Sequence, residues 1–333
     1  MCYSFFIILY ITILGFQQVV IAQKPTGYKI DVNIKPFQNK WVYLASYYGA
    51  SKELVDSAFL DANSYGVFED SRNLKQGLYL MASPNKAILF EMLVTNNQQF
   101  SIYMDTLKAD QSLKFIGSEE NDQLMAYTHI IALKAKQAEE VRKEIEAASD
   151  SVTKNALQKK IDDNMKAIND YRLTVIKNQA ESMLALLFKA MQEVPYPIEL
   201  QKPKTMADSM AQYRYGKEHY WDNIDFADGR LVRTPIFEDK LKNYLNNWVE
   251  PYPDSIIIEM NWMMAIGRND PEMSRYLISY FVNNYSYPKI RGQEKVFLEA
   301  YQRYVANNNP ASSWLSEYQR KIIAQRANLL TGN

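Results

Sequence analysis

The spacing of apolar residues changes once along this chain, at Phe115–Asp122. Before this stretch, apolar residues recur at every second position, and after it they recur at every third or fourth. Alternation predicts half-buried strands, whereas the longer spacing predicts amphipathic helices. Ser118 is placed to accept a hydrogen bond from the first free amides of a helix, and the acidic residues after it suit that helix's positive end. The pattern therefore predicts an α+β chain with a strand-rich head at residues 24–117 and a helical body beyond it.

The head is expected to be a small antiparallel β-sandwich or open barrel. Apolar and polar residues alternate strictly in its first run, and turn-forming residues separate this run from those that follow. The expected strands are Tyr28–Ile34, Trp41–Tyr48, Leu54–Leu60, Leu78–Met81, Ile88–Val94, Phe100–Met104 and Leu113–Ile116. Short strands at this spacing are typical of sandwiches and barrels.

A long helical hairpin is predicted at residues 118–194. Two apolar seams run along this region, and Ser149-Asp150-Ser151 forms a polar turn between them that can cap the second helix. Lys134 interrupts the first seam and Asn164 the second. A polar seam residue costs stability in a coiled coil, so the interruptions favour a hairpin that folds back on itself over a dimerisation coiled coil, which is the alternative.

The remainder, residues 195–333, is predicted to be a helical bundle or a short α-solenoid. One helix is expected from about Thr205 to Tyr220. Further helix starts are marked by prolines that would occupy the first helical position, each directly after a residue in the cap position, because proline is favoured at the first turn of a helix. These pairs are Thr234-Pro235, Tyr252-Pro253, Asp270-Pro271, Tyr287-Pro288 and Asn309-Pro310, and their regular spacing suggests five paired helices. In the last helix, Trp314, Tyr318 and Ile322 are expected to face inward.

Charge and cysteine content narrow the classes of function. Lys+Arg and Asp+Glu both number 38, so no global field attracts nucleic acid, and no nucleic-acid partner is expected. Residues 1–22 resemble a signal peptide cleaved near Ala22, which predicts a periplasmic or otherwise extracytoplasmic protein. An uncleaved N-terminal anchor is the alternative, and would be the only membrane attachment. The single cysteine is Cys2, so a mature chain would have no thiol nucleophile, disulfide or thiolate metal site.

The most individual segment follows the predicted helix that ends near Tyr220, and it supplies the candidate binding surface. The candidates are Trp221, Asp222, Asp225, Asp228, Arg230 and Arg233. The three aspartates depart from a calcium loop, which needs oxygen ligands at every second position and a closing Glu. They could serve as paired carboxylates for glycan hydrolysis, or simply cap turns and pair with the arginines. No catalytic residue, metal or cofactor is expected.

Several segments resemble a known family of envelope proteins. In the head they are Gly27-Tyr28-Lys29-Ile30, Val42-Tyr43-Leu44, Val55-Asp56-Ser57-Ala58, Gly77-Leu78-Tyr79 and Phe115-Ile116-Gly117-Ser118; in the body they are residues 220–226, 228–235 and 326–333. The head resembles the N-terminal β-domain of TlpA-like periplasmic thiol–disulfide oxidoreductases. The body resembles the helical domain of unknown function that often follows it.

This resemblance implies accessory domains that precede a thioredoxin domain with a Cys-x-x-Cys pair. That catalytic portion is missing from this sequence, so no redox residue can be transferred to it. We therefore expect a non-catalytic, exported binding or scaffold module of the cell envelope, with an unknown protein or peptide partner. The alternatives are a fragment of a longer thiol–disulfide oxidoreductase and an envelope glycan hydrolase that uses the Asp222–Asp228 segment.

Overall fold

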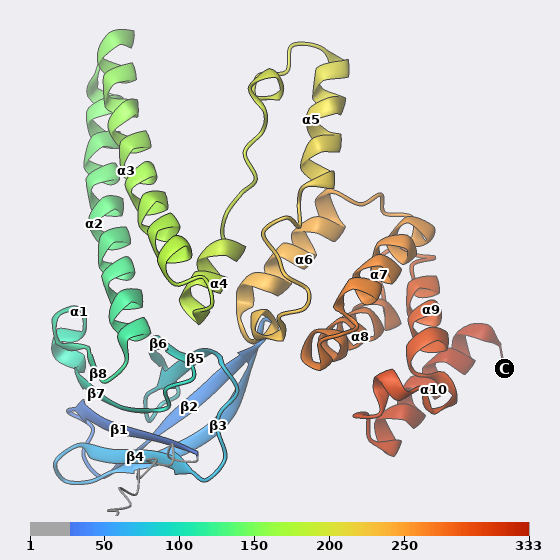
Figure 1. The fold of residues 1–333 in the computed structure, drawn as a ribbon, viewed down its shortest axis with the longest axis horizontal. Coiled ribbons are helices and arrows are strands. Elements are labelled where there is room, and N and C mark those ends of the chain that lie inside the picture. Colours follow the sequence, from blue (N-terminus) through green and yellow to red (C-terminus); the bar gives the residue numbers. More distant parts are fainter. Residues whose placement is uncertain (1–26, 333) are drawn as a thin grey trace, which may run out of the picture.

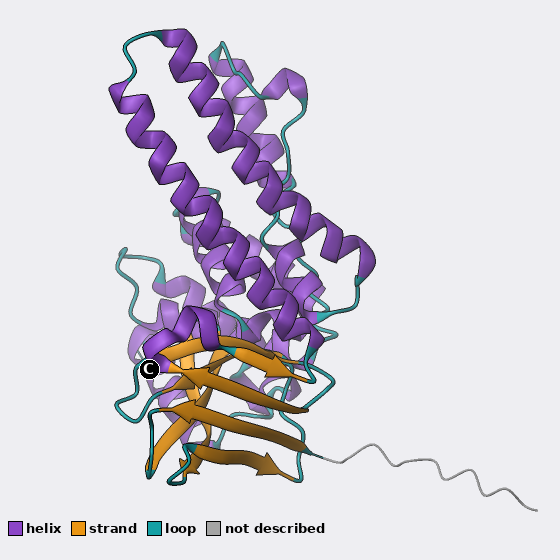
Figure 2. Ribbon diagram, turned by 90° about the vertical axis from the view of Figure 1, so that its left-hand side faces the viewer, coloured by secondary structure: helices purple, strands orange, loops and turns teal. Residues whose placement is uncertain are grey.

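The computed structural model describes residues 27–332, which form a β-sandwich followed by a helical body (Figures 1 and 2). This arrangement confirms the expected α+β class. The expected signal peptide, residues 1–22, lies outside the described residues. Within residues 27–332, no helix has both the length and the apolar character needed to cross a membrane.

The head consists of two four-stranded sheets that face each other. The first has the order β4-β1-β7-β8 and comprises β4 (Tyr65–Asp70), β1 (Tyr28–Lys35), β7 (Gln99–Asp105) and β8 (Lys114–Ile116). The second has the order β3-β2-β5-β6 and comprises β3 (Ser51–Leu60), β2 (Lys40–Tyr48), β5 (Gly77–Ala82) and β6 (Ile88–Val94). Alternation decides which side chains enter the sandwich: Ile30, Val32 and Ile34 are buried between the sheets, while Lys29 and Lys35 are exposed.

Two features of the head differ from the prediction. The sandwich is not purely antiparallel, because β1 pairs with β7 in parallel. Periodicity reports burial but not strand direction, so it could not reveal this pairing. In addition, β4 was not predicted: its sequence places Val67 next to Phe68 and lacks a clear alternation. Its antiparallel pairing with β1 and the complete burial of Phe68 hold it in the sheet.

A short segment, η1 (Thr106–Lys108) and α1 (Ala109–Ser112), connects β7 to β8. The predicted hairpin then follows as α2 (Glu119–Ala147) and α3 (Ser151–Asn178), two long antiparallel arms that project from the head (Figure 2). Asp150 caps α3 by accepting a hydrogen bond from the Thr153 amide at 2.8 Å. Ser118 does not act as predicted: its hydroxyl accepts from the Asn121 side chain at 2.8 Å and makes no bond to a helix amide.

The hairpin ends earlier than residue 194. After α3 the chain turns, and Ser182 caps a separate helix, α4 (Met183–Ala190), through the Ala185 amide at 3.0 Å. Seven of the eight residues of α4 are buried. Lys189 is the exposed residue of this apolar helix, so α4 lies in the core beneath the hairpin, where head, hairpin and body meet.

The rest of the chain forms the helical body. Its longer helices are α5 (Met206–Glu218), α6 (Pro235–Asn247), α7 (Pro253–Gly267), α8 (Pro271–Ser286), α9 (Glu294–Tyr304) and α10 (Glu317–Thr331). Its 3-10 turns are η2 (Ile198–Leu200), η3 (Gly229–Arg233), η4 (Ala306–Asn308) and η5 (Pro310–Ser312). The prolines at 235, 253 and 271 begin helices as predicted.

The prediction at Pro288 is wrong, because Pro288 lies in a loop and α9 begins only at Glu294. At Pro310 the predicted start is found, with Asn309 as its cap, but it opens only the short 3-10 helix η5. The long helix α10 begins after Ser316, whose hydroxyl accepts from the Gln319 amide in a capping box. The shift of this start carries Tyr318 and Ile322 to the exposed side of α10 instead of the core.

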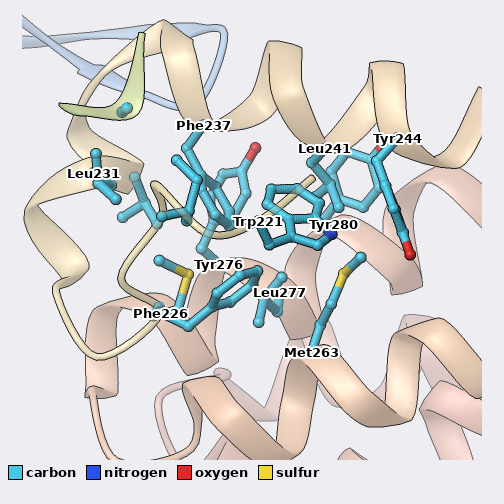
Figure 3. Packing of buried hydrophobic residues seen from close by; sticks show 14 of the residues in the cluster. Trp221, Phe226, Leu231, Phe237, Leu241, Tyr244, Met263, Tyr276, Leu277 and Tyr280 are labelled. Atoms are coloured by element: carbon cyan, nitrogen blue, oxygen red, sulfur yellow. The ribbon is translucent and has the colours of Figure 1, made fainter. Parts of the chain in front are cut away.

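One apolar core joins the head to the body. Figure 3 shows its centre, where Trp221 packs among Phe226, Phe237 and Tyr244. Side chains from β2, β5 and β6 belong to the same cluster. The turn between β2 and β3 also reaches the body: the Gly49 amide donates to the Val232 carbonyl at 2.7 Å. Gly49 has φ +57°, and a Cβ there would lie 2.1 Å from a Glu238 carboxylate oxygen, so this contact requires glycine.

Candidate functional site

The six sequence-predicted site residues do not form one surface. Trp221 is only 7% exposed and belongs to the core, with its ring 5.2 Å from that of Phe226. Asp225 accepts a hydrogen bond from the Ala227 amide at 2.8 Å and so stabilises a turn. The Asp222 carboxylate lies 2.7 Å from Nδ1 of the His219 ring, from which it can accept a hydrogen bond. These local contacts agree with the turn-capping role considered for the aspartates.

Asp228, Arg230 and Arg233 do come together, in a cavity of about 370 Å³ between head and body. Asp228 accepts hydrogen bonds from the Arg230 guanidinium, the shortest at 2.6 Å. Arg233 donates to Glu272 on α8 at 2.6 Å, and Lys75 of the head forms an ion pair with the same carboxylate. The charges in this cavity are therefore paired with one another, and they join the two parts of the molecule.

The pKa of Glu272 and a cation–π contact of Arg233 both agree with a charged junction between head and body. Burial raises the pKa of Glu272, but hydrogen bonds from Lys75 and Arg233 outweigh burial and leave the pKa below its ordinary value. The Arg233 guanidinium also lies 5.6 Å from the ring centre of Tyr48, a cation–π contact with the tip of β2. Burial raises the pKa of Tyr48 to about 12. Tyr48 therefore stays a neutral phenol at physiological pH.

A larger cavity, of about 670 Å³, lies between the end of α4, α5 and α6, with α3 contributing one residue. Its walls carry four aromatic side chains, and polar and charged groups stand between them. We call it the aromatic cleft and define it by Tyr196, Tyr215, Tyr220 and Trp248. The three elements that frame it can be followed in Figure 1, where the chain leaves α4, rises to α5 and returns into α6.

Close packing shapes the walls of the aromatic cleft. Gly216 on α5 has no side chain, and a Cβ there would lie 2.5 Å from the Trp248 ring and 2.6 Å from the Tyr196 hydroxyl. The Tyr220 hydroxyl donates to the Lys240 carbonyl at 2.9 Å and accepts from the Asn243 amide at 2.8 Å. These contacts hold the aromatic rings in fixed positions before any ligand binds.

Among the cleft residues, His219 has a side chain that can donate a hydrogen bond, accept one or take up a proton. Its Nδ1 lies 2.7 Å from an Asp222 carboxylate oxygen, and its ring centre lies 4.2 Å from that of Tyr215. A carboxylate on one ring nitrogen fixes the orientation of an imidazole, which leaves Nε2 as the nitrogen able to meet a ligand. The pair can therefore hydrogen-bond a ligand or accept a proton from it. In residues 27–332, no group of three or more His, Cys, Asp or Glu side chains is placed to hold a metal ion.

The sequence pattern singled out Asp222 but did not identify the cleft. Its lining comes from residue 172, residues 190–196, residues 215–220 and residues 236–248, which only the fold brings together. One local signal existed: Tyr215, His219 and Tyr220 recur at helical spacing along α5 and its end. That spacing equally suits a core face, so the pattern alone could not separate the two interpretations.

Comparison with known proteins gives one match. A family model described as a domain of unknown function, DUF5106, matches residues 156–333. No curated protein and no solved structure matches the chain. The matched region begins within α3 and runs through the whole helical body, so it contains every residue that lines the aromatic cleft.

Proposed function

The chain belongs to the DUF5106 family, and on this basis we propose that it is an exported binding module of the cell envelope that holds a ligand in the aromatic cleft. The cleft itself is the observation that carries the proposal. Its volume of about 670 Å³ is within the usual range of small-molecule sites. Such sites combine aromatic walls with a few placed polar groups, as this one does.

The chemistry of the walls suits holding a ligand. Tyrosine and tryptophan offer large, rigid contact areas and lose little conformational entropy on binding. Gln192 and Asn243 supply amide groups at the same cavity, and His219 supplies an oriented imidazole. The proposed role is therefore recognition by stacking and hydrogen bonding. In this proposal the protein binds its ligand without transforming it.

The second part of the proposal is a scaffold role. Head and body share one core and are joined by the Glu272 ion pairs, which supports a fixed orientation of the head relative to the cleft. The resemblance of the head to the β-domain of TlpA-like oxidoreductases extends the proposal: the module would act beside a protein or peptide partner of the envelope. Export is tested by N-terminal sequencing of the protein from the envelope fraction, which should begin at Gln23.

Ligand binding is tested by filling the cleft. Asn243 lines the cavity from the exposed side of α6, so Asn243→Trp should occupy the cleft with little cost to the fold. Asn246→Trp is the matched control, because Asn246 is exposed on the same helix but does not line the cavity. Thermal unfolding of residues 23–333 would be followed with a panel of cell-wall fragments, short peptides and sugars.

We expect at least one compound class to raise the melting temperature of the natural chain and of Asn246→Trp, but not of Asn243→Trp. The proposal is contradicted if no compound stabilises the natural chain. It is equally contradicted if the stabilisation is the same in both tryptophan variants, because binding would then lie elsewhere.

A further inference from the structure

We propose that the aromatic cleft binds a small organic anion, and that Lys240 on α6 and Arg172 on α3 receive its charged group. This inference rests on the proposed function and adds the chemical class of the ligand. Both cations line the cavity, and they approach it from different helices. The anionic group would be a carboxylate or another small oxyanion, because lysine and arginine bind both.

Lys240 is the main observation behind this assignment. It is half-buried, and its ammonium lies 5.3 Å from the ring centre of Tyr220. In the described part of the chain it forms no salt bridge, whereas Lys242 on the same helix pairs with Glu238 at 2.5 Å. Burial lowers the pKa of Lys240, as expected of a cation partly removed from water. Glu193 attracts the Lys240 ammonium and offsets part of the effect of burial, but it forms no salt bridge with it. A partly buried cation that is not paired at close range is costly, and a bound anion would offset that cost.

Arg172 supplies the second cation. Its Nε donates to the Tyr127 hydroxyl at 2.6 Å, and its guanidinium lies 5.3 Å from the Tyr127 ring centre. These contacts fix the side chain and use one of its five N–H groups. No salt bridge to Arg172 occurs within residues 27–332. The remaining N–H groups can therefore bind an oxyanion at the geometry that a guanidinium favours.

The acidic residues of the cleft do not cancel this positive charge. Glu193 and Asp239 also line the cavity, but both are exposed, while Lys240 and Arg172 are half-buried. Water and salt screen exposed charges more strongly than buried ones. The two cations are therefore the less exposed charges of the cleft, which suits a ligand whose anionic end enters first.

The aromatic walls define the rest of the ligand. Tyr215 and Trp248 line the cavity, and aromatic rings bind the flat or apolar faces of amino-acid side chains and sugars. The class is therefore a small molecule with one anionic group on an aromatic or sugar-like body.

The test uses two dyes of similar shape and different charge with residues 23–333. Anilinonaphthalene sulfonate is an aromatic anion, and phenylnaphthylamine is its neutral counterpart; both fluoresce more strongly in apolar sites. Lys240→Met removes the charge but keeps an apolar stem, and Lys240→Arg preserves the charge. Lys189→Met is the control, since Lys189 is exposed near the cleft but does not line it. Thermal melts show whether each variant is folded.

We expect Lys240→Met to lower the affinity for the sulfonate dye about tenfold or more, because the variant loses a charge-assisted hydrogen bond. Lys240→Arg should restore binding, Lys189→Met should not change it, and the neutral dye should bind all variants alike. Equal sulfonate affinity in Lys240→Met and the natural chain would overturn the inference. If Asn243→Trp still blocks the dye in that case, the proposed function survives; if Asn243→Trp has no effect on either dye, both fail.

Competition then distinguishes two sources of the anionic group. Glucuronate carries a carboxylate on a sugar, and N-acetyl-tyrosinate carries one on an amino acid. Displacement of the sulfonate dye by glucuronate supports a sugar acid, and displacement by N-acetyl-tyrosinate supports a peptide-like acid. Failure of both at millimolar concentration would contradict a carboxylate-binding site.

Discussion

The ion pairs at Glu272 offer the sharpest test of how head and body are joined. Glu272 lies in the first turn of α8 and binds two cations, Lys75 from the head and Arg233 from η3. Glu272→Gln keeps the size and the hydrogen-bonding capacity of the side chain but removes its charge. The variant therefore isolates the electrostatic contribution of the junction to the free energy of unfolding.

The expected loss of unfolding free energy follows from how exposed the paired side chains are. The Glu272 side chain is 17% exposed and Arg233 15%, so their bond lies between an exposed pair, worth about 0–1 kcal/mol, and a fully buried one, whose disruption costs about 3–5 kcal/mol. Lys75 is 58% exposed and adds little. A carboxylate in the first turn of a helix also gains about 0.3–1 kcal/mol from the helix dipole. We expect Glu272→Gln to lower the free energy of unfolding by about 2 kcal/mol.

Urea unfolding followed by circular dichroism measures this loss in residues 23–333. Glu139→Gln is the matched control, because the Glu139–Lys143 pair on α2 is exposed on both sides and should matter little. Adding Arg233→Met to Glu272→Gln should cost less than the sum of the single changes, since the buried cation no longer lacks a partner. Equal losses of unfolding free energy in Glu272→Gln and Glu139→Gln would show that the Glu272 ion pairs stabilise the fold no more than an exposed pair does.

Three further predictions concern the Glu272 carboxylate, the contact between Asn121 and β6, and the wall of the aromatic cleft. The pKa of Glu272 lies below its ordinary value, and such a carboxyl stabilises the fold above its unfolded pKa and loses that effect as pH falls through the folded pKa. The unfolding free energy of the natural chain should thus fall more steeply than that of Glu272→Gln below about pH 5, and parallel pH profiles would contradict this. Asn121 is fully buried and bonds both the amide and the carbonyl of Leu93, at 2.7 and 2.9 Å, so Asn121→Ala should cost about 2–3 kcal/mol in urea titration; a loss below about 0.5 kcal/mol would show that the bridge is dispensable. Gly216→Ala forces Trp248 or Tyr196 to move and should weaken phenylnaphthylamine fluorescence in the aromatic cleft, and unchanged affinity would speak against the cleft as its site.

Local patterns predicted the elements whose neighbours in sequence determine them. Alternation located the strand at Tyr28–Ile34, and the 3–4 spacing located both arms of the hairpin with their turn at Asp150. The helix starts at Pro235 and Pro271 followed from proline's fixed φ and missing amide hydrogen, which suit the first turn. The same signal failed at Pro288 and gave only a short 3-10 helix at Pro310, since a proline suits turns as well as helix starts.

Long-range pairing accounts for what the sequence could not show. The parallel contact of β1 with β7 joins segments about seventy residues apart, and no local pattern encodes its direction. The Glu272–Lys75 pair and the aromatic cleft are likewise built from segments distant in sequence. Trp221 was predicted to belong to a binding surface, yet its indole is buried against Phe237 of α6 and against Phe226, which lies in the loop between Trp221 and α6.

Binding in the aromatic cleft is tested most directly by a crystal structure of residues 23–333 grown with anilinonaphthalene sulfonate. We expect the dye between Tyr215 and Trp248, with its sulfonate in contact with the Lys240 ammonium. Dye bound elsewhere on the molecule, with the aromatic cleft holding only solvent, would show that the cleft is not the binding site.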